Sequence, residues 1–261
     1  MSGVIYNTNL SKAQGLIPET FELLALWEPG MTPIQLKSQV QSTGALGKAT
    51  ETRVNDIVTR GFAQRYLIEG GKPAAWLKRM LADQVSRSAL RQIILIFTAR
   101  HNPVLHDFLT STYWSKVFAG SGEITKADTR EFLERAASEG RIQPRWADSI
   151  MERVTRYLLG TLEDFQMIEE NRTGRRLTRP LTIHPETVRF LAHDLHFRGI
   201  DDRDLPAHPD WGLFGLMPAD VIAHLEKEAA RGHMQVQNAG QILRIEWKYS
   251  DMDHTLDAIA H

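Results

Sequence analysis

The sequence predicts a mainly α-helical protein with a helix-turn-helix or winged-helix-like N-terminal unit, a central helical bundle and a C-terminal region that ends in a β-hairpin. Three observations predict this fold class. Helix start signals recur along the chain, and apolar residues follow them at spacings of three and four. Glycine or proline closes several of these segments. One segment near the C-terminus alternates apolar and polar residues, which is typical of a strand.

The predicted N-terminal unit covers residues 1–72. Its first helix begins near Pro18 and ends at Pro29-Gly30. The second begins at Thr32-Pro33-Ile34-Gln35, where an N-cap threonine, a proline at the first helical position and a glutamine at the third form a capping box. We expect this short helix to carry the apolar residues Ile34, Leu36 and Val40 and to end near Gly44.

The third helix of this unit is expected to begin near Thr50. Its inward positions recur at helical spacing and are Val54, Ile57, Val58, Phe62 and Tyr66. Gly61 lies inside the helix and is unfavourable there. Three short helices joined by tight turns are the arrangement of a helix-turn-helix unit.

The predicted central bundle covers residues 73–168 and contains no strand signal. Its expected helices lie at about 74–84, 86–100 and 104–119, and two more begin at Thr125 and at Pro144. Residues 169–181 are polar and rich in arginine and glycine, so they predict a basic linker.

The predicted C-terminal unit covers residues 182–261. One helix is expected from Pro185 to Phe197 and another from Pro218 to Arg231. A short strand at 234–237, a turn through Asn238-Ala239-Gly240 and a strand at 243–249 then predict a hairpin. Helices followed directly by a hairpin match the winged-helix plan.

Composition excludes several classes of protein. The 261 residues contain no cysteine, so disulfides, thiolate nucleophiles and cysteine-based zinc sites are all excluded. Asn7, Thr8 and Asn9 stand where the apolar core of a signal peptide would lie, and the strongest apolar run, 93–97, is far too short to cross a bilayer. These features favour a cytoplasmic protein without membrane contact.

Charge is balanced overall but unevenly distributed. The net charge is −1, yet residues 1–100 contain 12 basic and 7 acidic residues, an excess of five positive charges. Any site for a polyanion should therefore involve the first third of the chain, the arginine cluster of the linker, or both.

No catalytic constellation is evident. Gly44 to Thr50 resembles a phosphate-binding loop, but only two residues separate its glycines and a helix precedes it, so a turn between helices is favoured over a nucleotide site. His193 and His196 are three apart on a helix, but no second paired motif completes a metal site. We expect no cofactor, no metal and no enzymatic activity.

Two sets of residues are candidate contacts for DNA. The first lies at and beyond the start of the third helix, where a recognition helix would enter the major groove: Lys48, Thr50, Thr52, Arg53, Asn55 and Arg60. The second is the arginine cluster of the linker, whose positive charges could hold phosphates: Arg172, Arg175, Arg176 and Arg179. A solvated helix surface of mixed charge and a solubilising linker are the respective alternatives.

Short segments from one end of the chain to the other form a recognisable series. They are Tyr6-Asn7-Thr8, Leu16-Ile17-Pro18-Glu19, Leu26-Trp27-Glu28-Pro29-Gly30, Leu46 to Val54, Arg91-Gln92-Ile93, Tyr113-Trp114, His208-Pro209-Asp210-Trp211 and the segment from Val236 to Tyr249. Through these residues the chain resembles the BrxA family of BREX bacteriophage-defence systems. None of these is a catalytic motif, and the resemblance rests on their order along the chain. Family members are often labelled inner-membrane proteins, and the lack of a spanning segment here contradicts that label.

The resemblance implies a helical protein with helix-turn-helix character that binds double-stranded DNA. It also implies a place beside other BREX proteins, namely a methyltransferase, an ATPase and a phosphatase-like component. The first hypothesis is therefore a DNA-binding accessory protein of a BREX system that contacts duplex DNA largely through phosphates. A protein–protein adaptor without direct DNA binding and a transcriptional regulator of its own operon are the alternatives.

Overall fold

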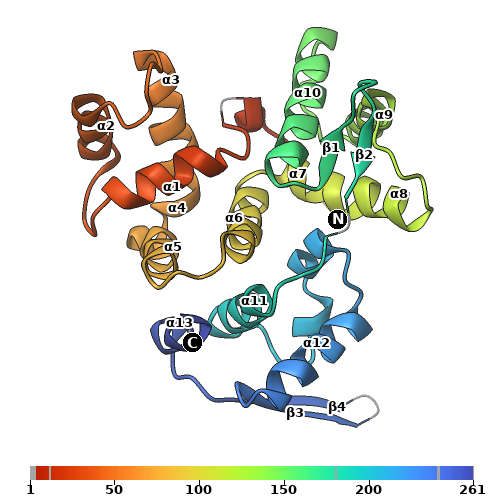
Figure 1. The fold of residues 1–261 in the computed structure, drawn as a ribbon. Coiled ribbons are helices and arrows are strands. Elements are labelled where there is room, and N and C mark those ends of the chain that lie inside the picture. Colours follow the sequence, from red (N-terminus) through yellow and green to blue (C-terminus); the bar gives the residue numbers. More distant parts are fainter. Residues whose placement is uncertain (1–3, 12, 180, 240–241, 261) are drawn as a thin grey trace. The chain divides into compact units, whose positions relative to one another are not determined.

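The computed structural model describes residues 4–11, 13–179, 181–239 and 242–260 (Figure 1). The described residues are mainly helical, with two short antiparallel hairpins, which confirms the predicted fold class. The chain divides into two compact units. Unit 1 contains Met1–Ala75 and Phe97–Pro180, and unit 2 contains Trp76–Ile96 and Leu181–His261. The division into residues 1–72, 73–168 and 182–261 stays a prediction.

Unit 1 begins with the helices predicted for the N-terminal region. A short 3-10 helix, η1 (Asn9–Ser11), precedes α1 (Ile17–Leu26) and α2 (Pro33–Thr43). The capping box of α2 is present, because the backbone N–H of Thr32 donates to Gln35 Oε1 at 2.8 Å and that of Gln35 donates to Thr32 Oγ1 at 3.3 Å. Leu36 and Val40 of this helix are buried, whereas Ile34 lies on the outer side of the first turn and is 81% exposed.

The third helix runs without interruption from Glu51 to Tyr66. It consists of α3 (Glu51–Asn55), a π-helical segment η2 (Asp56–Phe62) and α4 (Ala63–Tyr66), and we call it the 51–66 helix. All five side chains predicted to face inward are buried. The helix contacts both α1 and α2, so the three helices form one packed group. Residues 44–50 connect the last two, a longer link than the usual helix-turn-helix turn.

The rest of unit 1 is a second group of helices. The segment from α7 (Pro103–Phe108) through the π-helical η4 (Leu109–Tyr113) to α8 (Trp114–Phe118) contacts α9 (Lys126–Ser138), which in turn packs against α10 (Asp148–Asp164). The start of α10 at Pro144 was predicted wrongly. Ala147, in an extended conformation, supplies the first carbonyl acceptor to Met151 N–H at 3.0 Å, so the helix begins after it.

A β-hairpin closes unit 1 where a loop was predicted. Strand β1 (Ile168–Glu170) pairs with β2 (Arg176–Thr178) in antiparallel register, with Glu169 opposite Leu177. Backbone groups of residues 122–124 extend the pairing, because Ile124 N–H donates to Arg176 C=O and Thr178 N–H donates to Gly122 C=O, both at 3.0 Å. The segment 169–181 is therefore ordered by backbone hydrogen bonds over most of its length, and Pro180 lies outside the described residues.

The segment 13–16, which we call the strap, passes between two helices of unit 1. On one side a Cβ at Gly61 of the 51–66 helix would lie 2.7 Å from Leu16 Cδ1 and 3.0 Å from Ala13 Cβ. On the other side a Cβ at Gly160 of α10 would lie 3.1 Å from the side chain of Gln14. Gly61, unfavourable as a helix residue, is thus required by close packing.

Charged side chains from both helices hold the strap. Arg65 of the 51–66 helix is buried, and its guanidinium donates to the carbonyls of Ala13 and Gly15. Asp164 of α10 accepts from the backbone N–H of Gly15 at 3.0 Å. Helices that are distant in sequence therefore meet through four residues of non-helical chain.

Unit 2 contains α11 (Pro185–Phe197), α12 (Pro218–Ala230), α13 (Met252–Ala260) and two 3-10 helices, η5 (Leu205–Ala207) and η6 (Pro209–Phe214). The α5 (Lys72–Ala82) and α6 (Arg87–His101) helices each contribute residues to both units. The predicted C-terminal hairpin is confirmed as β3 (Met234–Ala239) paired with β4 (Ile242–Trp247), in antiparallel register. The predicted turn residue Gly240 lies outside the described residues.

A buried histidine joins α11 to the end of the hairpin. The His193 ring lies 4.9 Å from the ring of Trp247 and 5.3 Å from that of Tyr249, and its Nδ1 is 2.8 Å from the Arg189 carbonyl. Burial, which disfavours the charged ring, lowers the pKa of His193 to about 4, together with smaller contributions from His196, Arg189 and His233 and against the hydrogen bond to the Arg189 carbonyl, which raises it. His193 is therefore neutral in the folded protein at pH 7.

Close packing of the strap against Gly61 predicts that a larger side chain there destabilises the protein. Gly61→Val would place methyl groups against Ala13 and Leu16, and overpacking of this kind costs about 2 kcal/mol. We expect the free energy of unfolding, measured by urea denaturation, to fall by this amount. Gln64→Val on the exposed side of the same helix is the control and should change it by less than about 1 kcal/mol. Equal losses in the two variants would contradict close packing at Gly61.

The buried His193 predicts a dependence of stability on pH. The unfolded chain binds a proton at this histidine near pH 6.5 and the folded chain only near pH 4, so stability should decrease as the pH falls between these values. The decrease due to this residue is at most roughly 3 kcal/mol. His193→Phe should lessen the loss of unfolding free energy between pH 7 and pH 4.5. Parallel curves for the two proteins would show that His193 titrates normally.

Candidate nucleic-acid interface

The start of the 51–66 helix brings four of the predicted DNA contacts together. Thr50 is the N-cap, and its side chain accepts from Arg53 N–H at 3.2 Å. Lys48, Thr50, Thr52 and Arg53 are all exposed, because the helix turns Val54 and Ile57 toward the core. The N-terminal end of a helix carries partial positive charge and free N–H groups, which favour an anion. This turn therefore combines cations, hydroxyls and a helix end on one surface.

The remaining predicted residues of this helix are more constrained. Arg60 is exposed, but its Nε lies 3.5 Å from the carboxylate of Asp56. Asn55 is half-buried, and its side-chain oxygen accepts from Thr59 at 3.4 Å. Near the helix start, Lys37 of α2 pairs with Glu51 at 3.4 Å. The surface keeps a positive excess, which is concentrated in the first turn.

Carboxylates surround most of the arginine cluster. Arg175 pairs with Glu123 at 2.6 Å, and Arg179 with Glu169 at 3.3 Å. Arg176 lies between two acids, Glu163 at 2.8 Å and Glu170 at 2.6 Å. Arg172 is exposed at the tip of the hairpin, between β1 and β2. A phosphate at this cluster would have to compete with carboxylates that already engage three of the guanidiniums.

The two predicted sets lie on different helix groups of unit 1. The hairpin with the arginine cluster packs against α10, whereas the 51–66 helix packs against α1 and α2. Two exposed arginines on α10, Arg153 and Arg156, are not among the predicted contacts. Their spacing of three residues on the polar side of a predicted helix is the signal that could have identified them.

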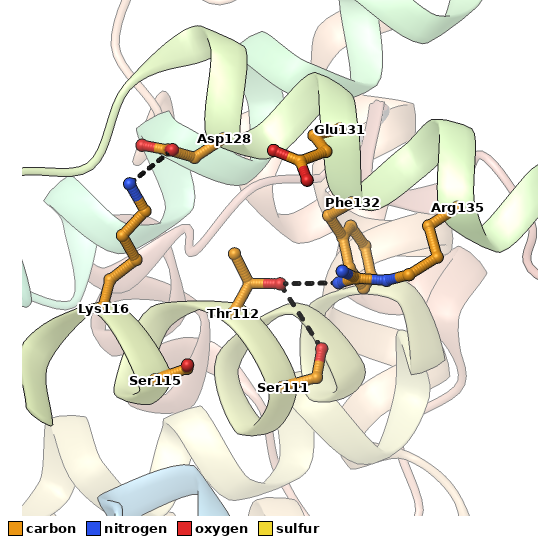
Figure 2. Close-up of a pocket in the computed structure, with 8 residues that line it drawn as sticks. All are labelled: Ser111, Thr112, Ser115, Lys116, Asp128, Glu131, Phe132 and Arg135. Carbon is orange, nitrogen blue, oxygen red and sulfur yellow. Dashed lines mark hydrogen bonds and ion pairs between the residues drawn. The ribbon is translucent and has the colours of Figure 1, made fainter. Parts of the chain in front are cut away.

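A polar pocket lies between α8 and α9 (Figure 2). It is open, has a volume of about 420 Å³ and is lined by Ser111, Thr112, Ser115, Lys116, Asp128, Glu131, Phe132 and Arg135. Figure 2 shows Lys116 and Arg135 reaching across it from opposite ends, to Asp128 at 2.6 Å and to Thr112 at 3.4 Å.

The chemistry of this pocket favours a structural role. Burial alone would raise the pKa of Asp128, but hydrogen bonds from Lys116 and Thr125 outweigh it and lower the pKa, so this carboxylate is ionised. Asp128 also caps α9 by accepting from Thr125 N–H at 2.8 Å. No histidine lines the pocket, so its hydroxyls have no neighbouring base of the usual kind.

An apolar pocket adjoins the 51–66 helix on the side of its C-terminal half. Its volume is about 910 Å³, and it opens between the end of α1, the start of α2 and α4. Its apolar lining comes from Trp27, Met31, Pro33, Ala63 and Leu67. No charged side chain lines it, which distinguishes it from the polar surface at the start of the same helix.

Two kinds of feature are absent from the described residues. No group of three or more His, Asp or Glu side chains in this part of the chain is arranged to hold a metal ion. No helix formed by the described residues has the length and apolar character needed to cross a bilayer.

Comparison with known proteins places this chain in a family. A crystal structure of an uncharacterized protein from Magnetospirillum magneticum is similar in fold, with a TM-score of 0.58 and 17% sequence identity over 74% of this chain and 94% of that chain. No curated protein sequence matches the chain. The family model of BrxA matches residues 4–194, which is most of the 261 residues. The chain therefore belongs to the BrxA family and is a BREX-associated protein.

Proposed function

We propose that this protein is a DNA-binding accessory component of a BREX phage-defence system and that it contacts duplex DNA largely through phosphates. The observation that carries the proposal is the first turn of the 51–66 helix. Lys48, Thr50, Thr52 and Arg53 are exposed together there, at the positive end of a helix whose other face is buried. Such a turn suits phosphate oxygens through charge, hydroxyl groups and backbone N–H groups at once.

The proposal assigns a smaller part to Arg172, Arg175, Arg176 and Arg179. Three of these side chains are engaged by glutamates, so binding a phosphate would first require breaking an ion pair. The gain in affinity from each contact would be reduced accordingly. The main contact surface is therefore the 51–66 helix, and the hairpin is secondary.

Such a role requires no chemistry from the chain itself. In a BREX system we propose that it works beside a methyltransferase, an ATPase and a phosphatase-like component, as a subunit that holds duplex DNA. A transcriptional regulator of the same operon would use the same surface but would prefer one operator sequence. Binding to duplex DNA without a preference for sequence would support the accessory role over that of a regulator.

The apolar pocket supports a second candidate function, that of a protein adaptor. Trp27, Met31 and Leu67 line an opening without charged side chains, and exposed apolar pockets are common features of protein interfaces. Ile34, 81% exposed, follows directly on Pro33 of the lining. A BREX partner could occupy this surface with or without DNA.

DNA binding is tested by reversing charge at the first turn. We expect Lys48→Glu/Arg53→Glu to lower the affinity for a random duplex of about 30 base pairs by roughly tenfold per lost contact at 0.1 M salt, and to flatten the salt dependence. Acidic residues suit a helix N-terminus, so the fold should be preserved. Fluorescence anisotropy over a salt series measures both quantities.

A matched control changes charge equally elsewhere. Arg203→Glu/Lys227→Glu alters the net charge by the same amount at two exposed cations of unit 2, outside both predicted sets, and it should leave the salt dependence nearly unchanged. Wild-type protein that fails to bind the duplex at low salt would refute the proposed function. Equal effects of the two double variants would refute the assignment to the 51–66 helix.

The adaptor function is tested by filling the apolar pocket. Ala63→Arg would place a long charged side chain among Trp27 and Leu67, and we expect it to abolish co-elution with a BREX partner in size-exclusion chromatography. Ser38→Arg, on the exposed side of α2, is the control and should co-elute normally. Retention of the complex by the Ala63 variant would exclude this pocket as the interface.

A further inference from the structure

We propose that the apolar pocket beside the 51–66 helix is a self-association surface, in which Ile34 of each of two copies of this chain enters the pocket of the other. The occupant of the pocket is thus a second copy of the same chain. Three features of the described residues carry this inference: an exposed apolar side chain next to the pocket, an uncharged lining, and exposed charges of both signs around it. Self-association goes beyond DNA binding and does not depend on it.

The protruding part of the surface is Ile34. Its side chain is 81% exposed, more than that of any other large apolar residue that the structure describes. It directly follows Pro33, a lining residue, in the first turn of α2. The capping box between Thr32 and Gln35 holds this turn, and a β-branched side chain on a helix has few rotamers. An apolar side chain therefore stands in water at a well-defined position, where a partner could cover it.

The receiving part of the surface is the pocket. None of its eleven lining residues is charged, and its volume of about 910 Å³ leaves room for an isoleucine side chain and its neighbours. Met31, Ala63 and Leu67 are half-buried, so they still expose apolar atoms to an incoming side chain. Ile68, 43% exposed, follows Leu67 and adds a second apolar group at the edge. Interface centres are poor in charge and commonly contain an apolar anchor in a pocket.

The adjacency of Ile34 and the pocket favours a second copy as the occupant. In a two-fold symmetric interface the same patch serves both copies, so each contact is made twice. A protruding side chain next to a cavity suits this arrangement, because each copy supplies one side chain and one cavity. A different protein would have to bring both a side chain and a cavity at the matching separation to cover the same patch.

The charges around the pocket favour the same occupant. Glu28, Glu69 and Lys72 are exposed, and each is next in sequence to a lining residue. A rim with both signs can pair with the identical rim of a second copy, whereas a uniformly basic or acidic partner would meet like charge on part of it. The net charge of −1 adds little repulsion between two copies.

The self-association surface leaves the proposed DNA contacts accessible. Lys48, Thr50, Thr52 and Arg53 belong to the N-terminal end of the 51–66 helix, and none of them lines the pocket at its C-terminal half. A dimer would therefore carry two such turns, and two linked contacts bind one duplex more tightly than a single contact when both can reach it. Dimerisation and duplex binding are measured separately, so the failure of one is distinguishable from the failure of the other.

Sedimentation velocity over a concentration series tests the inference on the full chain. We expect wild type to reach twice the mass of one chain, and Ile34→Arg and Ala63→Arg to raise the dissociation constant of the dimer by at least roughly tenfold, because each places a cation in an apolar contact. Ser138→Arg, at an exposed position of α9, is the control and should match wild type. Ile34 is exposed, so thermal unfolding of Ile34→Arg should also match wild type, and this variant carries the test even if Ala63→Arg destabilises the fold.

The lack of cysteine allows a direct test of which residues meet. Ile34→Cys mixed with Ala63→Cys and oxidised in air should give a disulfide-linked dimer that joins positions 34 and 63, identified by mass spectrometry. Ile34→Cys mixed with Ser138→Cys is the control and should give little. Equal cross-linking in the two mixtures would overturn the inference. So would wild type that stays monomeric up to its solubility limit, and binding of a BREX protein by that monomer through the pocket would leave the adaptor function in its place.

Discussion

The arrangement of unit 1 depends on how the strap is held between the 51–66 helix and α10. A buried guanidinium is strongly destabilised unless most of its donors find acceptors, and both terminal nitrogens of Arg65 donate to backbone carbonyls, those of Ala13 and Gly15. Its Nε is buried without a hydrogen-bond partner among the described residues. Burial lowers the pKa of Arg65, while Tyr66 and Asp164 favour its charged form. The buried charge of Arg65 thus requires the strap to keep its backbone path, and the strap in turn positions the 51–66 helix and α10.

The strap requires glycine wherever it touches a helix closely. Gly61 and Gly160 let the helices approach, and Gly15 faces Asp164, where a Cβ would lie 2.6 Å from the Cβ of that residue. His101 lies near enough to Arg65 for the arginine to lower its pKa, although burial lowers it more, and the histidine stays neutral beside the buried cation. The glycines and the neutral His101 ring therefore leave room for the buried Arg65 to hold the strap.

Local signals predicted most of the helices and one hairpin. The capping box of Thr32 and Gln35, the inward spacing of the 51–66 helix and the alternation before Tyr249 all depend on near neighbours in sequence, so they could be recognised from sequence. The β1–β2 hairpin and the strap depend on partners such as Gly122, Gly160 and Asp164, which lie far away in sequence. The hairpin and the strap have no periodic pattern of apolar residues from which these distant contacts could be predicted.

The same limit applies to the candidate interface. Arg172 to Arg179 stand out in the sequence because no acid interrupts them, but the fold brings Glu123 and Glu163 to them from other elements. The cluster is therefore less positive in the fold than its sequence indicates. A phosphate is attracted by the positive charge that remains on the surface after ion pairing. For a chain with balanced charge, that remainder is set by tertiary contacts, so clusters in the sequence locate a polyanion surface less well than cations without partners in the fold.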